Sequence, residues 1–481
     1  MVFEKKEECG LFGIYGDPQA VQKTYFGLYS LQHRGQESAG IASSDGENLQ
    51  VYADMGTVGR VFRASRGVLE KLANPIAIGH VRYSTSGSSK AVNSQPFFSE
   101  YSRGQVAVAH NGNIINASLL RDEYEAYGHI FKTTTDTEII CHLLAKPSHV
   151  TKPDPIGHVL NHLQGAYCLL FLFDDRIEAA RDPYGIRPLC IGQTQEGYYC
   201  VASETCALDA IGAKFIREVE PGEIVTLNER GISSRFFVER GSIKPAHCIF
   251  EHVYFAKQNS TIFEQNVHNF RKRLGRQIAK EHPADADVVI PVPDSGTSAA
   301  IGFSEESGIA FDMGLVRSHY VGRTFISPSQ SLRELQVKLK LAVVKEVVKG
   351  KRIVVVDDSI VRGTTTRGKM LALREAGAKE IHMRVSCSPI RFPCFYGVDF
   401  PTKEELVANN KTLDEIRDFL GVESLGYLSL EGMLSCADKP ADNYCTACWS
   451  GRYRIPVDIS VNKFQMEKYQ MGLFEQGSEE L

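Results

Sequence analysis

The segment Arg352–Thr366, R-I-V-V-V-D-D-S-I-V-R-G-T-T-T, decides the predicted fold of the C-terminal half of the chain. Within it, Ile353–Val356 is an unbroken run of β-branched residues, which is typical of a short strand buried on both faces. Asp357 and Asp358 follow, and the threonines Thr364–Thr366 open a helical stretch. In an open α/β sheet, ligands bind at the carboxyl ends of the strands, and the helix N-termini that lie there hold phosphate. The pattern favours a phosphosugar site over the alternative of a buried strand with an acidic turn.

The sequence around this segment alternates helical and strand patterns from about Ile249 onward. This βαβ alternation predicts a parallel sheet with helices on both faces. The expected helices are 264–281, 298–307, 403–420 and 460–472, and the expected strands are Ala286–Val292, Ile353–Val356 and Ile381–Val385.

Length and composition indicate two globular domains. The chain has 481 residues, 43% hydrophobic and 23% charged, and its net charge is −4. Lys and Arg are scattered, so neither nucleic acid nor a membrane surface is implied as a partner. No apolar run is long enough to span a bilayer, and the N-terminus is not that of a secretory signal. We therefore expect a cytoplasmic location.

Residues 9–240 contain many short strand patterns separated by turns rich in Gly, Asn and Asp. They predict a layered α+β architecture with largely antiparallel sheets. The expected strands are Gly10–Tyr15, Ala77–Tyr83, Val106–His110, Ala166–Phe173 and Tyr198–Ala202, and the expected helices are 19–31 and 117–127.

Polar motifs lie at the ends of these strands. They are C-G-L-F-G-I from Cys9, L-Q-H-R-G-Q-E-S-A-G from Leu31, G-H-V-R-Y-S-T from Gly79, H-N-G-N from His110 and T-D-T-E from Thr135. Taken alone, Cys9 is an ordinary strand residue, H-N-G-N predicts a tight turn, and Asp136 has the position of a helix N-cap. The ordered set resembles class II glutamine amidotransferase domains, which are N-terminal-nucleophile hydrolases with a four-layer α+β fold.

The resemblance implies that Cys9 is the nucleophile of amide hydrolysis. As a chain terminus, Cys9 has its own α-amino group as base, with a pKa near 8. A free terminus at Cys9 requires cleavage after Glu8, so we expect Met1–Glu8 to be a propeptide.

The resemblance also implies roles for the other motif residues. It assigns Asn111 and Gly112 to the oxyanion hole, Arg82 to the glutamine carboxylate, Asp136 to the glutamine amino group, and Arg34 to support of the terminus. The alternative for Arg82 and Asp136 is a surface ion pair and a helix cap.

The opening segment resembles the binding loop of type I phosphoribosyltransferases, which bind phosphoribosyl pyrophosphate (PRPP). The resemblance implies that Pro291–Thr297 is the pyrophosphate loop and Arg317–Leu332 a flexible lid. Some relatives carry a serine, credited with touching Mg²⁺, where this chain has Gly296, so the expected Mg²⁺ ligands are Asp357 and Asp358. The expected PRPP contacts are Asp357, Asp358, Ser359, Arg362, Gly363, Thr364, Thr365, Thr366 and, from the lid, Arg323.

Together the two halves and the junction Phe250–Ala256 resemble the amidophosphoribosyltransferase family. The resemblance implies a propeptide (1–8), a glutamine amidotransferase domain (9–240) and a phosphoribosyltransferase domain (241–481). The implied reaction uses glutamine and PRPP and yields phosphoribosylamine, pyrophosphate and glutamate, which opens de novo purine synthesis. A homotetramer with feedback inhibition by purine nucleotides is also implied.

Among twelve cysteines, only the pair Cys445 and Cys448 shows metal-ligand spacing. Spacing alone leaves zinc, a redox pair and an iron–sulfur cluster open. The chain resembles the subgroup of this family with a 4Fe–4S cluster, and this resemblance adds Cys248 and Cys394 as ligands.

Two other functions remain as alternatives. One is a class II amidotransferase that uses a sugar phosphate or aspartate as acceptor, against which the PRPP loop argues. The other is a PRPP-sensing DNA-binding regulator, for which a helix-turn-helix unit and a basic face are missing from the sequence.

Overall fold

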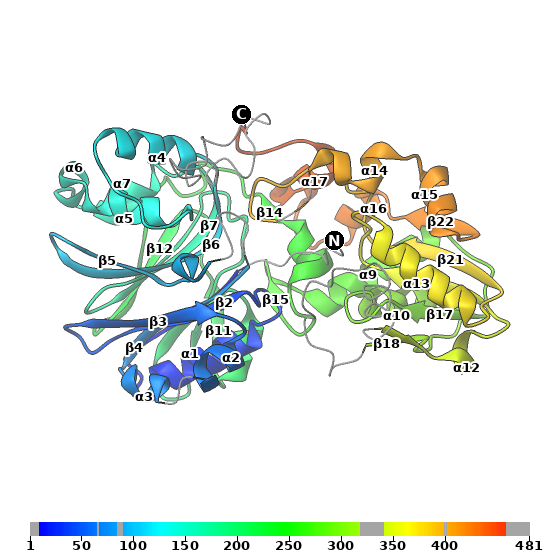
Figure 1. Cartoon of the computed structure of the whole chain (residues 1–481), viewed down its shortest axis with the longest axis horizontal. Coiled ribbons are helices and arrows are strands. Elements are labelled where there is room, and N and C mark those ends of the chain that lie inside the picture. Colours follow the sequence, from blue (N-terminus) through cyan, green and yellow to red (C-terminus); the bar gives the residue numbers. More distant parts are fainter. Residues whose placement is uncertain are drawn as a thin grey trace, which may run out of the picture.

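The computed structural model describes residues 9–64, 67–83, 90–317, 341–398, 400 and 402–457. The two halves of the chain lie side by side along the longest axis, the N-terminal half in blue to green and the C-terminal half in green to red (Figure 1). The predicted propeptide Met1–Glu8, the predicted helix 460–472 and the lid beyond Arg317, including Arg323, lie outside the described residues.

Two antiparallel sheets form the centre of the N-terminal half. The seven-stranded sheet has the order β11 (Lys214–Glu218), β9 (Cys190–Gln193), β10 (Tyr199–Ala202), β1 (Gly10–Tyr15), β4 (Ile76–Arg82), β2 (Ser38–Ser44) and β3 (Leu49–Met55). The six-stranded sheet has the order β13 (Gly231–Phe236), β12 (Glu223–Asn228), β8 (Ile177–Arg181), β7 (Gly165–Leu172), β6 (Gly104–Ile114) and β5 (Phe97–Tyr101).

Alternating side chains on these strands face two different apolar cores. On β1, Leu11 packs between the two sheets, whereas Phe12 and Ile14 pack against helix α1. On β6, Ala107 faces the other sheet and Val108 faces the outer helices. Each sheet is therefore buried on both faces, and the half has four layers, helix–sheet–sheet–helix, as the resemblance implied.

Helices cover the outer face of each sheet (Figure 1). Beside the first sheet lie α1 (Ala20–Ser30), α2 (Val58–Ala64), α3 (Val68–Lys71) and α8 (Thr205–Ala210). Beside the second lie α4 (Ala117–Ala126), α5 (Glu138–Ala145), α6 (Pro147–Val150) and α7 (Pro155–Leu160).

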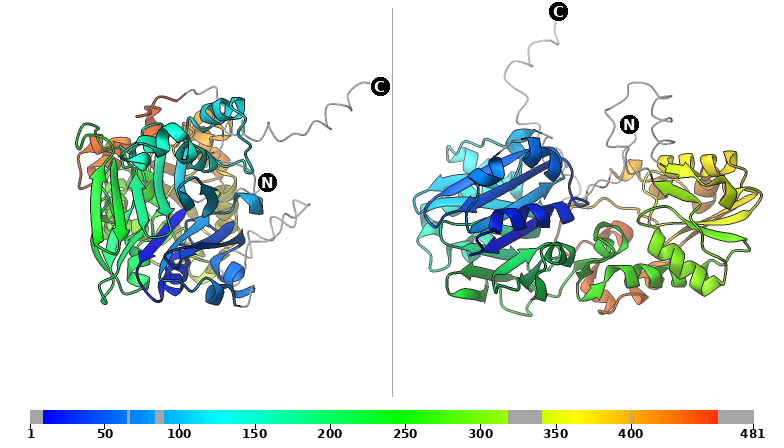
Figure 2. Two further views of the ribbon diagram at one scale, coloured as in Figure 1. Left: turned by 90° about the vertical axis from the view of Figure 1, so that its left-hand side faces the viewer. Right: turned by 90° about the horizontal axis from the view of Figure 1, so that it is seen from below.

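A four-stranded parallel sheet forms the centre of the C-terminal half, as predicted. Its order is β17 (Val288–Pro291), β20 (Arg352–Asp357), β21 (Glu380–Val385) and β22 (Ser424–Tyr427). Helices α9 (Val267–Glu281) and α10 (Thr297–Ser307) lie on one side of this sheet and α13 (Thr364–Glu375) on the other (Figure 2). The other α-helices among the described residues of this half are α12 (Lys345–Val348), α14 (Val407–Asn410), α15 (Leu413–Leu420), α16 (Leu430–Ser435) and α17 (Ala447–Ser450).

Three local predictions are wrong. His110–Asn113 is not a turn: it continues β6 to Ile114, paired with β7. Asp136 is not an N-cap, because α5 begins after Thr137 and the Asp136 carboxylate accepts from the Ile114 amide. The predicted helix 403–420 is broken into a 3₁₀ turn, α14 and α15, since Thr412 starts α15 with its own capping box.

In the described part of the chain, the helices are too short or too polar to cross a bilayer.

Candidate functional site

Cys9 lies at the buried start of β1, and its thiol Sγ is 3.5 Å from the Tyr83 carbonyl oxygen. The strand after it pairs with β4, Gly10 opposite Val81, so Cys9 is beside the end of β4 where Arg82 stands. Burial raises the pKa of the Cys9 thiol to about 11, while the Arg82 charge opposes this rise. The thiol therefore needs a nearby base to form the thiolate at neutral pH.

Arg82 and Asp136 are both buried, which argues against the alternative of a surface ion pair. Arg82 Nη1 lies 3.2 Å from the Glu37 carboxylate, and Asp136 Oδ1 lies 3.5 Å from His110 Nδ1. The charges of both residues act on the Cys9 thiol. The structure thus brings one cationic and one anionic group to the same nucleophile.

Asn111 and Gly112 lie in β6 of the second sheet. Asn111 is 1% exposed, and its side-chain Nδ2 has no hydrogen-bond partner among the described residues. Gly112 has φ +145°, and a Cβ there would lie 1.9 Å from the Ala166 carbonyl oxygen. Only glycine fits at this position. A spare buried donor beside it is what an oxyanion site requires.

A buried network of four charges joins this site to the C-terminal half. Arg34 Nε donates to the Cys9 carbonyl at 2.9 Å, and its guanidinium binds both oxygens of Glu251 at 2.6 and 3.0 Å. Arg34 also pairs with Glu204, and Arg187 pairs with Glu251 at 3.3 Å. All four side chains have 0% exposure. Burial opposes ionisation of Glu204, but His33 and Arg34 outweigh it and hold the pKa of this carboxyl well below its ordinary value.

The acidic pair of the opening segment lies at the carboxyl end of β20, as predicted. Asp357, Asp358 and Ser359 are all buried, and the Ser359 hydroxyl donates to Asp358 at 2.6 Å. Lys369 Nζ lies 3.4 Å from Asp357. Gly363 is the N-cap of α13, so Thr364, Thr365 and Thr366 form its first turn. Arg362 pairs with Glu405 at 3.0 Å and is oriented by that contact.

The expected pyrophosphate loop, Pro291–Thr297, lies beside this edge because β17 and β20 are neighbouring parallel strands. A Cβ on Gly296 would lie 2.5 Å from the Val356 carbonyl oxygen, so the backbone approach leaves no room for a serine. The neighbouring Ser295 hydroxyl donates to the Asp358 carboxylate instead. A hydroxyl in contact with the acidic pair is thus present one residue before Gly296.

Cys248, Cys394, Cys445 and Cys448 converge between the two halves. Cys248 in β14 (His247–Cys248) pairs directly with Cys445 in β23 (Tyr444–Cys445). Cys448 in α17 is electrostatically coupled to the other three thiols, and burial raises its pKa well above the ordinary value. The twelve cysteines are all free thiols. Among the described residues, no three of these sulfurs lie within 4.8 Å of one another, whereas a preformed zinc site needs separations of about 3.8 Å.

Sequence reasoning missed Glu204, Arg187, Glu251 and Arg271. Arg271 in α9 donates to three carbonyls of the junction, those of His252, Tyr254 and Ala256, each at 2.8 Å. The available signal was a charged residue inside an apolar stretch, as in I-R-P-L around Arg187 and I-F-E-H around Glu251. Charges in such places are paired in native structures.

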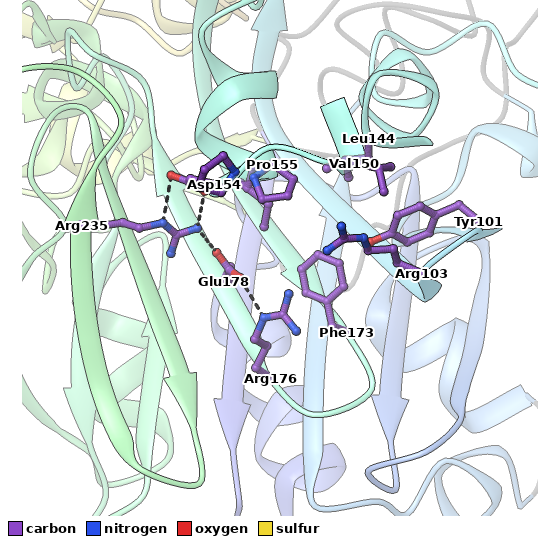
Figure 3. Close-up of a pocket in the computed structure, with 12 residues that line it drawn as sticks. Tyr101, Arg103, Leu144, Val150, Asp154, Pro155, Phe173, Arg176, Glu178 and Arg235 are labelled. Carbon is purple, nitrogen blue, oxygen red and sulfur yellow. Dashed lines mark hydrogen bonds and ion pairs between the residues drawn. The ribbon is translucent and has the colours of Figure 1, made fainter. Parts of the chain in front are cut away.

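An open cavity of about 300 Å³ lies elsewhere, between β5, β8, β13 and the start of α7 (Figure 3). Its acidic groups are already paired: Arg235 binds Asp154 and Glu178, and Arg176 binds Glu178 at 2.8 Å. It contains none of the motif residues, so we assign no catalytic role to it.

Comparison with known proteins agrees with this geometry. A glutamine amidotransferase domain family matches residues 80–210. An amidophosphoribosyltransferase of Methanocaldococcus jannaschii is 48% identical over 475 residues, which is 95% of this chain and 99% of the relative. A chloroplastic amidophosphoribosyltransferase of Glycine max is 49% identical over 460 residues, 95% of this chain and 80% of the relative.

Solved structures agree over both halves. The glutamine PRPP amidotransferase of Bacillus subtilis, complexed with ADP and GMP, matches with a TM-score of 0.88 and 46% identity over 94% of this chain and 99% of that one. Because these matches span both halves, they support neither the DNA-binding regulator nor an amidotransferase with a sugar phosphate or aspartate as acceptor. The chain belongs to the amidophosphoribosyltransferase family, the glutamine-dependent enzymes of the first step of purine biosynthesis.

Proposed function

We propose that the chain performs this activity as two coupled half-reactions, with glutamine hydrolysed at Cys9 and PRPP aminated at the end of β20. The observation that carries the proposal is the buried charge network, in which Arg34 contacts both the Cys9 carbonyl and Glu251 of the junction. We assign residues 9–240 to the glutamine domain and 241–481 to the PRPP domain. Ammonia made in the first passes to the second.

In the glutamine half-reaction, the Cys9 sulfur attacks the side-chain amide carbon and forms a tetrahedral oxyanion. The thiol proton moves to the α-amino group of Cys9, which then protonates the departing ammonia and leaves a thioester. Water activated by the same amine hydrolyses the thioester, and glutamate leaves. The unpartnered Asn111 Nδ2 and the Gly112 amide stabilise the oxyanion.

The glutamine zwitterion binds between two opposite charges. Its α-carboxylate pairs with Arg82, where a guanidinium binds both oxygens, and its α-amino group pairs with Asp136. The burial of both side chains supports these roles, because a buried charge interacts more strongly than an exposed one. Arg34 holds the Cys9 carbonyl and so fixes the terminus.

This mechanism requires a free amino group on Cys9, so we propose that Met1–Glu8 is removed as a propeptide. The intact mass of the active enzyme should correspond to a chain that begins at Cys9. Active enzyme that retains residues 1–8 would contradict the mechanism.

In the second half-reaction, the 5-phosphate of PRPP binds the first turn of α13, where amides and the hydroxyls of Thr364, Thr365 and Thr366 are available. Asp357 and Asp358 accept from the ribose hydroxyls, and Ser359, Arg362 and Gly363 shape the loop. Ammonia attacks C1 from the side opposite pyrophosphate, the C1–O bond breaks, and the amine loses a proton. Arg323 remains a proposed pyrophosphate contact outside the described residues.

The acidic pair and the Ser295 hydroxyl fit a magnesium ion, since carboxylate and hydroxyl oxygens suit it. When bound, Mg²⁺ neutralises charge that develops on pyrophosphate. Asp357, Asp358 and Ser295 would hold it.

The four converging cysteines fit a 4Fe–4S cluster, which thiolates hold. Such a cluster would tie Cys248, Cys394, Cys445 and Cys448 together and serve as a structural or regulatory group, since neither half-reaction transfers electrons. Anaerobically purified enzyme should show iron–sulfur charge-transfer absorption that oxygen bleaches together with activity. Full activity without this absorption would rule the role out.

The relative solved with ADP and GMP supports feedback inhibition by purine nucleotides here, and we propose a homotetrameric cytoplasmic enzyme.

Two variants, one in each half, test whether the two half-reactions occur at separate sites. Cys9→Ala should abolish glutamate release but keep phosphoribosylamine synthesis from added ammonia, because the PRPP site is intact. Asp358→Asn should lower pyrophosphate release at least about 100-fold while glutamate is still formed. The exposed Asp312, in the same half, offers a control: Asp312→Asn should release glutamate and pyrophosphate at the rates of the parent.

Loss of both half-reactions in either folded variant would contradict the proposal. Glutamate formation without PRPP-dependent pyrophosphate in the parent would contradict it as well.

The charge network is tested by Glu251→Gln, which leaves two buried guanidiniums with one carboxylate. Breaking a buried pair in this way costs about 3–5 kcal/mol, so thermal unfolding should occur at a clearly lower temperature. Glutamine-dependent synthesis should fall further than ammonia-dependent synthesis, because Arg34 no longer ties Cys9 to the junction.

The matched control is Glu220→Gln, which breaks the surface pair with Arg240. Surface pairs contribute little, so this variant should behave as the parent. Equal unfolding temperatures for Glu251→Gln and Glu220→Gln would show that the network does not join the halves.

A further inference from the structure

Three histidines converge at the outer end of the N-terminal half. His149 lies in α6, His158 lies in α7, and His162 follows α7 by two residues. One ring nitrogen of each lies within 4.8 Å of one ring nitrogen of both others. The ring centroids are 4.7 to 4.9 Å apart. In Figure 1, α6 and α7 are at the left, at the opposite end of the molecule from α13.

Hydrogen bonds to backbone carbonyls fix the protons of two of these rings. His149 Nδ1 lies 2.9 Å from the Leu143 carbonyl oxygen, and His162 Nδ1 lies 2.8 Å from that of His158. A carbonyl only accepts, so each Nδ1 carries the hydrogen and each Nε2 carries a lone pair. Metal-ligating histidines are oriented in this way, with the second nitrogen donating to a carbonyl or carboxylate.

The surroundings favour the neutral form of two of the rings, His149 and His158. Burial, and then the neighbouring histidines, lower the pKa of His149 and of His158. Lys146 and Lys152 add to this effect. The two lysines also oppose a bound cation. Solvent screens the exposed Lys152, and Lys146 lies 4.0 Å from the Glu123 carboxylate. Neutral imidazole is the form that binds a metal.

The spacing of the rings is near that of a metal site. With zinc–nitrogen bonds of about 2.0–2.1 Å, tetrahedral ligands are about 3.3 Å apart, so the nitrogens need to approach by no more than about 1.5 Å. His162 is exposed, so a small shift of its side chain about the hydrogen bond to the His158 carbonyl supplies part of this movement. His158 and His162 are four residues apart, which places them on one face of a helical turn.

We propose that His149, His158 and His162 form a binding site for one divalent transition-metal ion of the zinc class, with water from the exposed side as fourth ligand. Three imidazoles suit Zn²⁺, Ni²⁺ or Cu²⁺ far better than Mg²⁺. The ion joins α6 to α7 across residues 151–154 and, through the His149 contact with Leu143, to the end of α5. Its role is structural, because both reaction centres lie elsewhere.

The competing explanation is a cluster of rings that pack on one another without a metal. Their planes meet at 78°, 37° and 69°, and such contacts also occur between apolar aromatic rings. A packed cluster gains nothing from added metal, whereas a site for an ion is stabilised by it.

Metal binding by the full-length enzyme without a histidine tag separates the two explanations. In excess Mg²⁺ and under anaerobic conditions, equilibrium dialysis should give one Co²⁺ per chain. The difference spectrum between loaded and metal-free enzyme should show d–d absorption and no new thiolate charge transfer, which excludes cysteine ligands. Added Zn²⁺ should displace Co²⁺ and raise the unfolding temperature. His158→Gln and His162→Gln should each weaken this binding at least about tenfold and remove the temperature shift.

His129→Gln is the matched control, since His129 lies in the same half, is partly exposed and has its ring contacts with His142 and Tyr124 rather than with the three histidines. It should bind Co²⁺ as the parent does, and all three variants should keep the parent's synthesis rate. Equal Co²⁺ binding by His158→Gln, His162→Gln and the parent would overturn the proposal. So would Co²⁺ bound through thiolates only, or no rise in unfolding temperature with Zn²⁺.

Discussion

The rest of the molecule depends on the charge balance among Arg34, Arg187, Glu204 and Glu251. Four charges without solvent exposure are costly unless each is paired, and here two cations face two anions. The partners come from four separate segments of the chain. Glu251 belongs to the π-helical turn η2 (Glu251–Phe255), which follows β14 near the start of the C-terminal half. Glu251 therefore compensates the charges of Arg34 and Arg187 only when the two halves pack together in this one arrangement.

The same docking positions the residues next to the candidate oxyanion site. Asn113 Nδ2 donates to the Phe395 carbonyl at 2.8 Å, and Gly397 packs against Gly112. Arg187 donates from Nε to the Tyr396 carbonyl at 3.1 Å. The segment that follows Cys394 thus lies against the strand that carries Asn111 and Gly112. The segment next to Cys394 therefore lies against the candidate glutamine site.

Local sequence pattern predicted most of the fold. A run such as Ile353–Val356, or the start of α13, indicates its secondary structure without any contact distant in the chain. H-N-G-N was misjudged because its turn-forming residues are held in β6 by pairing with β7, a contact distant in sequence. The site motifs were found by resemblance. Pairing between Arg34 and Glu251 could not be predicted, since no local pattern specifies which buried charges meet. The three histidines escaped notice because they converge only when α6 folds onto α7.

Arg271 interacts electrostatically with both candidate sites. Burial lowers the pKa of its guanidinium to about 10, while the charges of Asp358, Glu204 and Glu251 oppose that effect. Asp358 belongs to the candidate PRPP loop, and Glu204 and Glu251 belong to the buried charge network beside Cys9. One buried cation thus interacts with both sites while its nitrogens hold three carbonyls of the junction. Its position is set by these backbone contacts, so Arg271 holds a fixed positive charge that interacts with Asp358 as well as with the two buried glutamates.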